Sequence, residues 1–134
     1  LMAGIYMLDT DICSYIIRNN PQSVIQKIWE HRHDDIRISA VTRAELLHGA
    51  RRKKSADLIR RVQAFVDRWE VVAFDTLAAE AYAEILAELE EKGRPIGNLD
   101  VLIAACARAA DAVLVTNNQK HFSQIRGLVT QNWV

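Results

Sequence analysis

The segment IYMLDTD, residues 5–11, places two carboxylates directly after a short apolar run. A run of this kind fits a buried strand. Burying a carboxylate at the end of such a strand costs free energy unless a positive charge lies beside it. Asp9 and Thr10 therefore either cap the helix that follows or take part in binding a metal ion. The segment alone does not decide between these two interpretations.

Polar side chains follow other predicted strands in the same way. Glu45 lies in a helix that begins directly after the strand DIRIS, and the strand AVLVT ends at Thr116, followed by Asn117 and Asn118. Asp100 lies in the first turn of an otherwise apolar helix. Open parallel sheets carry their sites beyond the carboxyl ends of the strands, so these groups and Asp9 are expected to meet at one edge of the sheet.

Each acid taken alone has a simpler structural explanation. Asp100 would stabilise its helix by roughly 0.3–1 kcal/mol through the helix dipole, and Glu45 fits an ordinary solvated position. Several acids at one edge repel each other, however, unless protons or cations relieve the repulsion. Oxygen-only ligands favour Mg²⁺ or Mn²⁺ over zinc. We therefore predict a carboxylate metal site in which Asp9, Glu45 and Asp100 hold the ion, directly or through water.

The elements that would position these acids alternate between strands and helices, which predicts an α/β fold with a mostly parallel central sheet. Strands are expected at residues 5–8, 35–39, 71–74, 112–116 and 127–133. Helices are expected at 10–18, 41–51, 55–68, from 76 to about 93 and at 98–110, with a further one capped by Asn20 and starting at Pro21. The order indicates one three-layer domain over residues 1–134, residues 1–4 being an expression remnant or a disordered end.

The composition is that of a globular protein and indicates no particular function. The 134 residues include 17 basic and 17 acidic ones, so a nucleic-acid binder would need a local basic patch. Cys13 and Cys106 fall in apolar helical patterns and are expected to be buried, reduced thiols. No apolar run approaches the ~20 residues of a membrane span, and no signal peptide is evident. A soluble, cytoplasmic protein is expected.

Four segments resemble, in order, the motif blocks of PIN-domain ribonucleases, and more narrowly of VapC toxins. They are MLDTDICSYII, SAVTRAELLHGA, GRPIGNLDVLIAACARA and LVTNNQKHFSQIRGLVTQNW. The family's acids fall on Asp9, Glu45 and Asp100. The resemblance implies a three-layer PIN-like domain and a Mg²⁺- or Mn²⁺-dependent endoribonuclease. It also implies a homodimer, a cognate VapB antitoxin that holds it inactive, and an RNA target for which tRNA is the expectation.

The chain departs from the family's pattern at two places. Asp11 stands where these toxins usually have Asn, and it either joins the site or caps the helix. Many relatives carry a fourth acid after the strand that ends at Thr116, but this chain has Asn118 and His121 there. The family's fourth carboxylate is therefore missing, which leaves open whether one ion or two bind.

Weaker signals concern support of the acids and contact with RNA. Supporting roles through hydrogen bonds or charge are expected for Thr10, Asp11, Thr116, Asn117 and Asn118. Basic groups that could neutralise phosphates are Arg43, Arg51, Arg52, Lys53, Lys54 and Arg94. A charge run such as the one at residues 51–54 is more often a solvated helix end than an RNA-binding patch.

Three other functions account for parts of the same pattern. A non-catalytic PIN-like scaffold that binds RNA or protein is compatible with the missing fourth acid. A receiver-type signalling domain would explain Asp9, Asp11 and Thr116, but it leaves Glu45 and Asp100 without a role. A Rossmann dinucleotide-binding domain is disfavoured because no G-x-G-x-x-G follows the first strand.

Overall fold

A single parallel sheet forms the centre of the computed structural model, which describes residues 4–134. The strands are β1 Ile5–Leu8, β2 Asp35–Ser39, β3 Glu70–Val72, β4 Ala112–Val115 and β5 Val129–Gln131. Their order across the sheet is β3-β2-β1-β4-β5, and every neighbouring pair is parallel. The predicted end segment, residues 1–4, falls outside the described residues except for Gly4.

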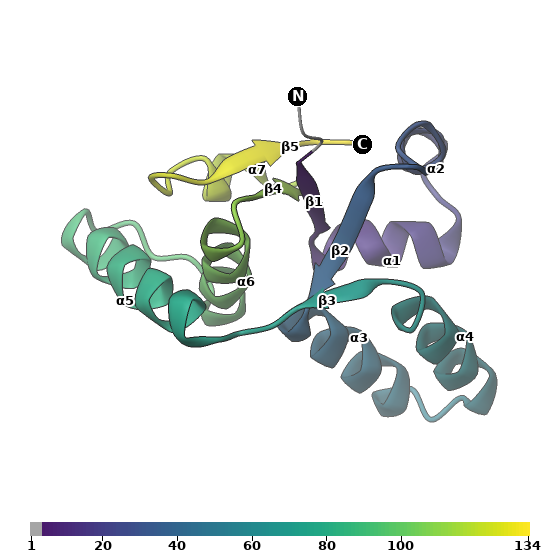
Figure 1. The fold of residues 1–134 in the computed structure, drawn as a ribbon. Helices are drawn as coiled ribbons and strands as arrows, with labels where there is room; N and C mark the ends of the chain where they lie inside the picture. The colour runs from purple at the N-terminus through teal and green to yellow at the C-terminus, as the bar shows by residue number, and fades with distance from the viewer. Residues whose placement is uncertain (1–3) are drawn as a thin grey trace.

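Helices cover both faces of the sheet (Figure 1). Their bounds are α1 Thr10–Arg18, α2 Gln22–Glu30, α3 Ala40–Arg52, α4 Ala56–Val66, α5 Thr76–Glu91, α6 Asn98–Ala109 and α7 Gln119–Phe122. One core packs Met7 and Leu114 against α5 and α6, and the other packs Leu8, Ile38 and Val115 against α1 to α4. Successive residues of a strand point to opposite faces, so Met7 and Leu8 serve different cores. This arrangement confirms the predicted three-layer α/β fold.

The register of the central strands brings their carboxyl ends to one level. Leu8 pairs with Ile38 on one side and with Val115 on the other. The residues that come next, Asp9, Ser39 and Thr116, therefore leave the sheet at the same edge. The backbone amide of Asp9 also donates to the Val115 carbonyl at 3.0 Å, which fixes the first carboxylate relative to β4.

Most element boundaries lie within two residues of the expected ones. The last strand is shorter than the expected 127–133, since β5 is Val129–Gln131. Two further differences, at β3 and at the start of α2, have a local explanation. The strand predicted at 71–74 is β3, Glu70–Val72. It ends at Val72 because Val72 pairs with Ser39, the last residue of β2 before the chain turns into α3. The helix predicted to begin at Pro21 begins at Gln22 instead. The N-cap is Pro21 and not Asn20, whose backbone amide donates to the Tyr15 carbonyl and closes α1.

Both cysteines lie in helices and are buried, as their apolar surroundings in the sequence predict. Cys13 and Cys106 are both buried and free, so neither forms a disulfide. Within residues 4–134, no helix has the length and apolar character needed to cross a bilayer.

Candidate active site

Asp9 is the most buried of the predicted site acids, with 5% of its surface exposed. It is the N-cap of α1, and its Oδ1 accepts a hydrogen bond of 2.9 Å from the Ile12 amide. Burial raises the pKa of Asp9 to about 6; hydrogen bonds from the Thr116 hydroxyl and the Ile12 amide oppose that shift, and the charges of Asp11 and Asp100 add to it. Capping the helix and serving a site are therefore compatible roles for this side chain.

Asp11 and Asp100 complete a group of three carboxylates within electrostatic range of one another. Asp100 is partly buried in the first turn of α6, and Asp11 is exposed in the first turn of α1. Burial raises the pKa of Asp100, the charge of Asp11 raises it further, and His121 lowers it. Mutual repulsion of this kind is what a bound cation would relieve.

Glu45 reaches the site from α3 through a hydrogen bond rather than through charge. The Thr10 hydroxyl donates to Glu45 Oε1 at 2.7 Å, and Thr10 Oγ1 lies 3.0 Å from Thr42 Oγ1. Since Thr10 follows Asp9 directly, these bonds tie Glu45 to the end of β1. Thr42 is fully buried and was not among the predicted site residues, although its position three residues before Glu45 puts both on one face of α3.

The polar residues after β4 divide between the site and a neighbouring structural network. Thr116 is buried, and its Oγ1 accepts a 2.9 Å bond from the Asn118 amide. The Asn118 side-chain nitrogen lies 2.9 Å from His121 Nδ1. The two residues that stand where many relatives carry the fourth acid are therefore hydrogen-bonded to each other. Asn117 instead bonds to the Tyr15 hydroxyl at 3.3 Å and to Asn132 at 3.1 Å.

A hard divalent cation fits this set of donors. Asp9, Asp11 and Asp100 offer only oxygen, and two of them have raised pKa values that a cation would bring back toward normal. Among residues 4–134, no three His, Cys, Asp or Glu side chains converge tightly enough to form a finished metal cage. These residues thus fit a hard cation by the chemistry of their donors, and Asp9, Asp11 and Asp100 are the side chains that would hold it.

The basic residues predicted to contact RNA have different surroundings. Arg43 forms an ion pair with Asp67 at 2.8 Å and donates to the Val66 carbonyl at 3.1 Å, which ties α3 to the end of α4. Arg94 is exposed in the loop between α5 and α6. The four consecutive cations at residues 51–54 are exposed at the end of α3.

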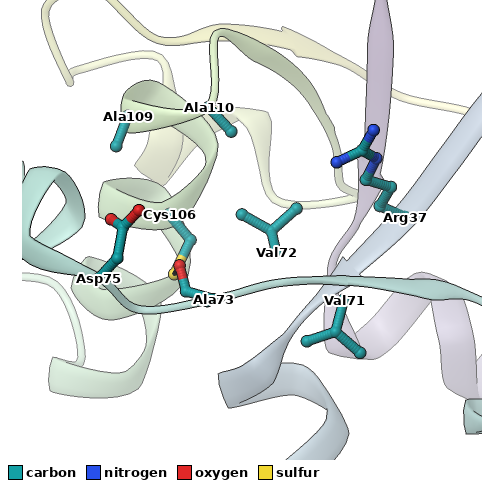
Figure 2. Close-up of a pocket in the computed structure, with 8 residues that line it drawn as sticks. All are labelled: Arg37, Val71, Val72, Ala73, Asp75, Cys106, Ala109 and Ala110. Carbon is teal, nitrogen blue, oxygen red and sulfur yellow. Dashed lines mark hydrogen bonds between the residues drawn. The ribbon is translucent and has the colours of Figure 1, made fainter.

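A cavity of about 210 Å³ lies apart from these acids, beside β3 and α6 (Figure 2). Asp75 and Cys106 line one side of it and Arg37 the other. Burial raises the pKa of the Cys106 thiol to about 11, with a further contribution from Asp75. A thiol with this pKa is protonated and unreactive near neutral pH, so Cys106 does not serve as a nucleophile in this cavity.

Sequence comparisons place known relatives over nearly the whole chain. The model of the PIN domain family matches residues 6–128. A protein of Rickettsia felis named ribonuclease VapC2 is 40% identical over 131 residues, covering 96% of this chain and 98% of its own length. A protein of Shigella flexneri named tRNA(fMet)-specific endonuclease VapC is 37% identical over 129 residues, covering 96% of this chain and 97% of its own length.

Solved structures give the same result. The VapBC2 complex of Rickettsia felis, bound to a DNA fragment from its promoter, contains a chain that superimposes with a TM-score of 0.87 at 39% identity. The match covers 97% of this chain and 99% of that one. A chain of the DNA-bound VapBC complex of Salmonella typhimurium gives a TM-score of 0.86 at 36% identity, covering 99% of this chain and all of the other.

Proposed function

Because this chain belongs to the PIN domain family, and within it to the VapC ribonucleases, we propose that it is the endoribonuclease toxin of a VapBC toxin–antitoxin pair. The observation that carries the proposal is the meeting of Asp9, Asp11 and Asp100 at the carboxyl edge of the sheet, with Glu45 linked to them through Thr10. These groups have little structural reason to share one edge, since burial and their mutual repulsion raise the pKa of Asp9 and Asp100.

The proposed reaction is hydrolysis of an RNA phosphodiester bond. A bound Mg²⁺ or Mn²⁺ would supply a polarised water and would neutralise charge on the phosphate. Asp9 and Asp100 would hold that ion and Glu45 would reach it through water, because Thr10 fixes one Glu45 oxygen. In the reaction, the water oxygen would bond to phosphorus as the bond from phosphorus to one ribose oxygen breaks. One of Asp9, Glu45 and Asp100 would take the proton of the water, and the leaving ribose oxygen would take a proton from solvent.

The proposed substrate is tRNA. The name of the Shigella relative specifies tRNA(fMet), and the Salmonella typhimurium protein of the same name is 35% identical over 129 residues. The VapC chains of the superimposed structures come from complexes with VapB, so a VapB-type antitoxin is the proposed protein partner.

We propose further that the chain forms a homodimer. Three large apolar side chains, Val71, Phe74 and Leu77, are exposed over a short segment that leads from β3 into α5, with exposed fractions of 39%, 39% and 61%. A second copy packing on this segment would remove apolar surface from water, at roughly 25 cal/mol per Å².

Incubation of total cellular RNA with the purified, antitoxin-free chain tests the nuclease proposal. The reactions contain Mg²⁺, Mn²⁺ or a chelator, and run beside the Asp100→Asn variant. Loss of intact tRNA with the appearance of discrete shorter fragments is expected, and the fragments should disappear with chelator and with Asp100→Asn. A folded protein that cleaves nothing in either metal would instead favour the non-catalytic scaffold, with Asn118 and His121 as the suspected cause.

A further inference from the structure

A second cavity, of about 290 Å³, opens directly beside the candidate active site. Its walls are one face each of α1 and α3, and its floor includes Leu46 together with Leu58 and Val62 of α4. Thr10 and Glu45, the pair that links the site acids, line it as well. The cavity therefore continues from the site along the surface between two helices.

The polar residues of this cavity are ordered along its length. Thr10 on α1 and Glu45 on α3 lie at the end next to the acids, whereas Arg18 on α1 and Arg52 and Lys53 at the end of α3 line the other end. With a helix rise of about 1.5 Å per residue, Thr10 and Arg18 are roughly 12 Å apart along α1. The cations are thus too far from the acids to hold the phosphate that is cleaved, but they can reach a neighbouring phosphate of the same strand.

These cations also lack acidic partners. Among the described residues, Arg18, Arg52 and Lys53 form no ion pair, and Arg18 is positioned by lying 5.2 Å from the centre of the Tyr15 ring. Elsewhere many basic side chains are paired, as Lys27 is with Glu30 and Arg60 with Asp57. In a chain whose charges cancel, this local excess of free positive charge fits an anionic ligand.

We propose that this cavity binds the nucleotide next to the scissile phosphate of the RNA. Arg18, Arg52 and Lys53 bind its phosphate, and its sugar and base pack over the apolar floor formed by Leu46, Leu58 and Val62. The inference rests on the proposed nuclease function. It places the single-stranded RNA next to the cleaved bond in the cavity between α1 and α3.

The middle of the cavity is kept open by small residues. Ser14 of α1 and Gly49 of α3 line it, and a Cβ added at Gly49 would meet no atom within 4 Å. Gly49 lies in the interior of α3, where glycine costs roughly 0.5–1 kcal/mol relative to alanine. Glycine at this position therefore keeps the cavity open and does not stabilise the helix. A larger side chain at position 49 can fill the cavity without a clash at its Cβ.

RNA binding in the absence of metal tests the proposal with a readout other than cleavage. The probe is a short, fluorescein-labelled single-stranded RNA of mixed sequence, titrated with the full chain in chelator at several salt concentrations. The Arg52→Gln/Lys53→Gln variant is expected to weaken binding by about tenfold at low salt. Its plot of log affinity against log salt should become shallower by about 0.7 for each phosphate that the variant no longer neutralises. Gly49→Phe should weaken binding to a similar degree.

The matched control is Lys27→Gln/Arg60→Gln, which removes the same charge from exposed, ion-paired positions on α2 and α4. It is expected to change the affinity and the salt slope little. Equal effects of both double variants would reduce the result to net charge and overturn the proposal. Unchanged RNA binding in Gly49→Phe, with loss of binding to a purified VapB-type antitoxin, would assign the cavity to a peptide and would also overturn it.

Cleavage with metal separates this inference from the proposed function. If both hold, the cavity variants raise KM with little change in kcat, because they act on a flanking nucleotide. Cavity-dependent RNA binding without any cleavage would contradict the nuclease alone. Cleavage that the cavity variants leave unchanged would contradict this inference alone. Melting curves of each variant exclude unfolding as the cause.

Discussion

The Thr10 hydroxyl donates a 2.7 Å hydrogen bond to Glu45 Oε1 and so joins the end of β1 to α3 across 35 positions of the chain. The same hydroxyl oxygen of Thr10 lies 3.0 Å from the hydroxyl of Thr42, which is fully buried. With Thr10 donating to Glu45, Thr42 must donate to Thr10. The orientation of Glu45 therefore depends on two threonines that carry no charge.

Replacing Thr10 by valine tests that dependence, because valine has nearly the same shape and no hydroxyl. The change frees Glu45 and leaves the buried Thr42 hydroxyl without an acceptor, which should cost about 1–3 kcal/mol of the free energy of unfolding. Cleavage of RNA under single-turnover conditions should fall by about tenfold, since roughly 1.4 kcal/mol of lost orientation gives that factor. Thr10→Ser keeps the hydroxyl and should retain most activity; equal loss in both variants would argue against the hydrogen bond.

The burial of Asp9 predicts a pH dependence of stability in the metal-free protein. The folded group has a pKa of about 6, above its ordinary value of 3.8, so between these values the folded state holds a proton that the unfolded state has released. The free energy of unfolding should therefore fall as pH rises from about 4 to 6 and level off above that range. Asp9→Asn keeps the helix cap and removes this contribution, so it should be the more stable protein at pH 7.

Urea denaturation of both proteins in chelator, at several pH values, measures this effect. The gain in Asp9→Asn at pH 7 is expected to be of the order of 1–3 kcal/mol, at about 1.4 kcal/mol per pKa unit. A constant difference between the two proteins from pH 4 to pH 8 would contradict the raised pKa. Loss of RNA cleavage in the same variant would show that the Asp9 carboxylate, although it destabilises the fold, is needed for catalysis.

Divalent cations should stabilise the folded chain by relieving the repulsion among Asp9, Asp11 and Asp100. At a hundredfold excess over the dissociation constant, the gain is about 2.7 kcal/mol and is observed as a higher Tm. Asp100→Asn should remove most of the shift, and Asp11→Asn should reduce it. Asp57→Asn, at an exposed position of α4, is the control and should respond like the unsubstituted chain. An undiminished shift in Asp100→Asn would remove Asp100 from the metal site.

The exposed apolar segment that leads from β3 into α5 should control self-association. Leu77 is 61% exposed, so Leu77→Lys has little to disturb within one chain but places a charge in the proposed dimer interface. Light scattering after size exclusion should find a dimer for the unsubstituted chain and a monomer for Leu77→Lys. Trp29→Lys provides the control, since Trp29 is 62% exposed on α2. A monomer at all concentrations before any substitution would contradict the homodimer.

Much of this protein could be predicted from short stretches of sequence. The bounds of β1 and α1 follow from the apolar run and the acid that ends it, and Ser55 and Asp75 cap the helices that they precede. These features depend on residues within one or two turns of each other. The alternation of strands and helices then predicts parallel strands, and parallel strands predict that Asp9 and Thr116 share an edge.

The details of the candidate site could not be predicted in the same way. Asn117 follows β4 as Asn118 does, but only its position in the folded chain turns it toward Tyr15 and Asn132. Arg43 precedes Glu45 by two residues, but it pairs with Asp67 at the end of α4. The sequence contains no signal for any of these three partners, because each lies more than ten residues away and is selected by how the elements pack.

Local sequence encodes the order of the elements, their caps, the three-layer architecture and the acids that stand at the strand ends, because these features arise from hydrogen bonds between near neighbours and from hydrophobic periodicity. Folding of the whole domain is what brings Leu8, Ile38 and Val115 level, joins Thr10 to Glu45, and leaves a cavity between α1 and α3. Those outcomes depend on side-chain packing between segments far apart in the chain, and that packing exists only in the completed tertiary structure.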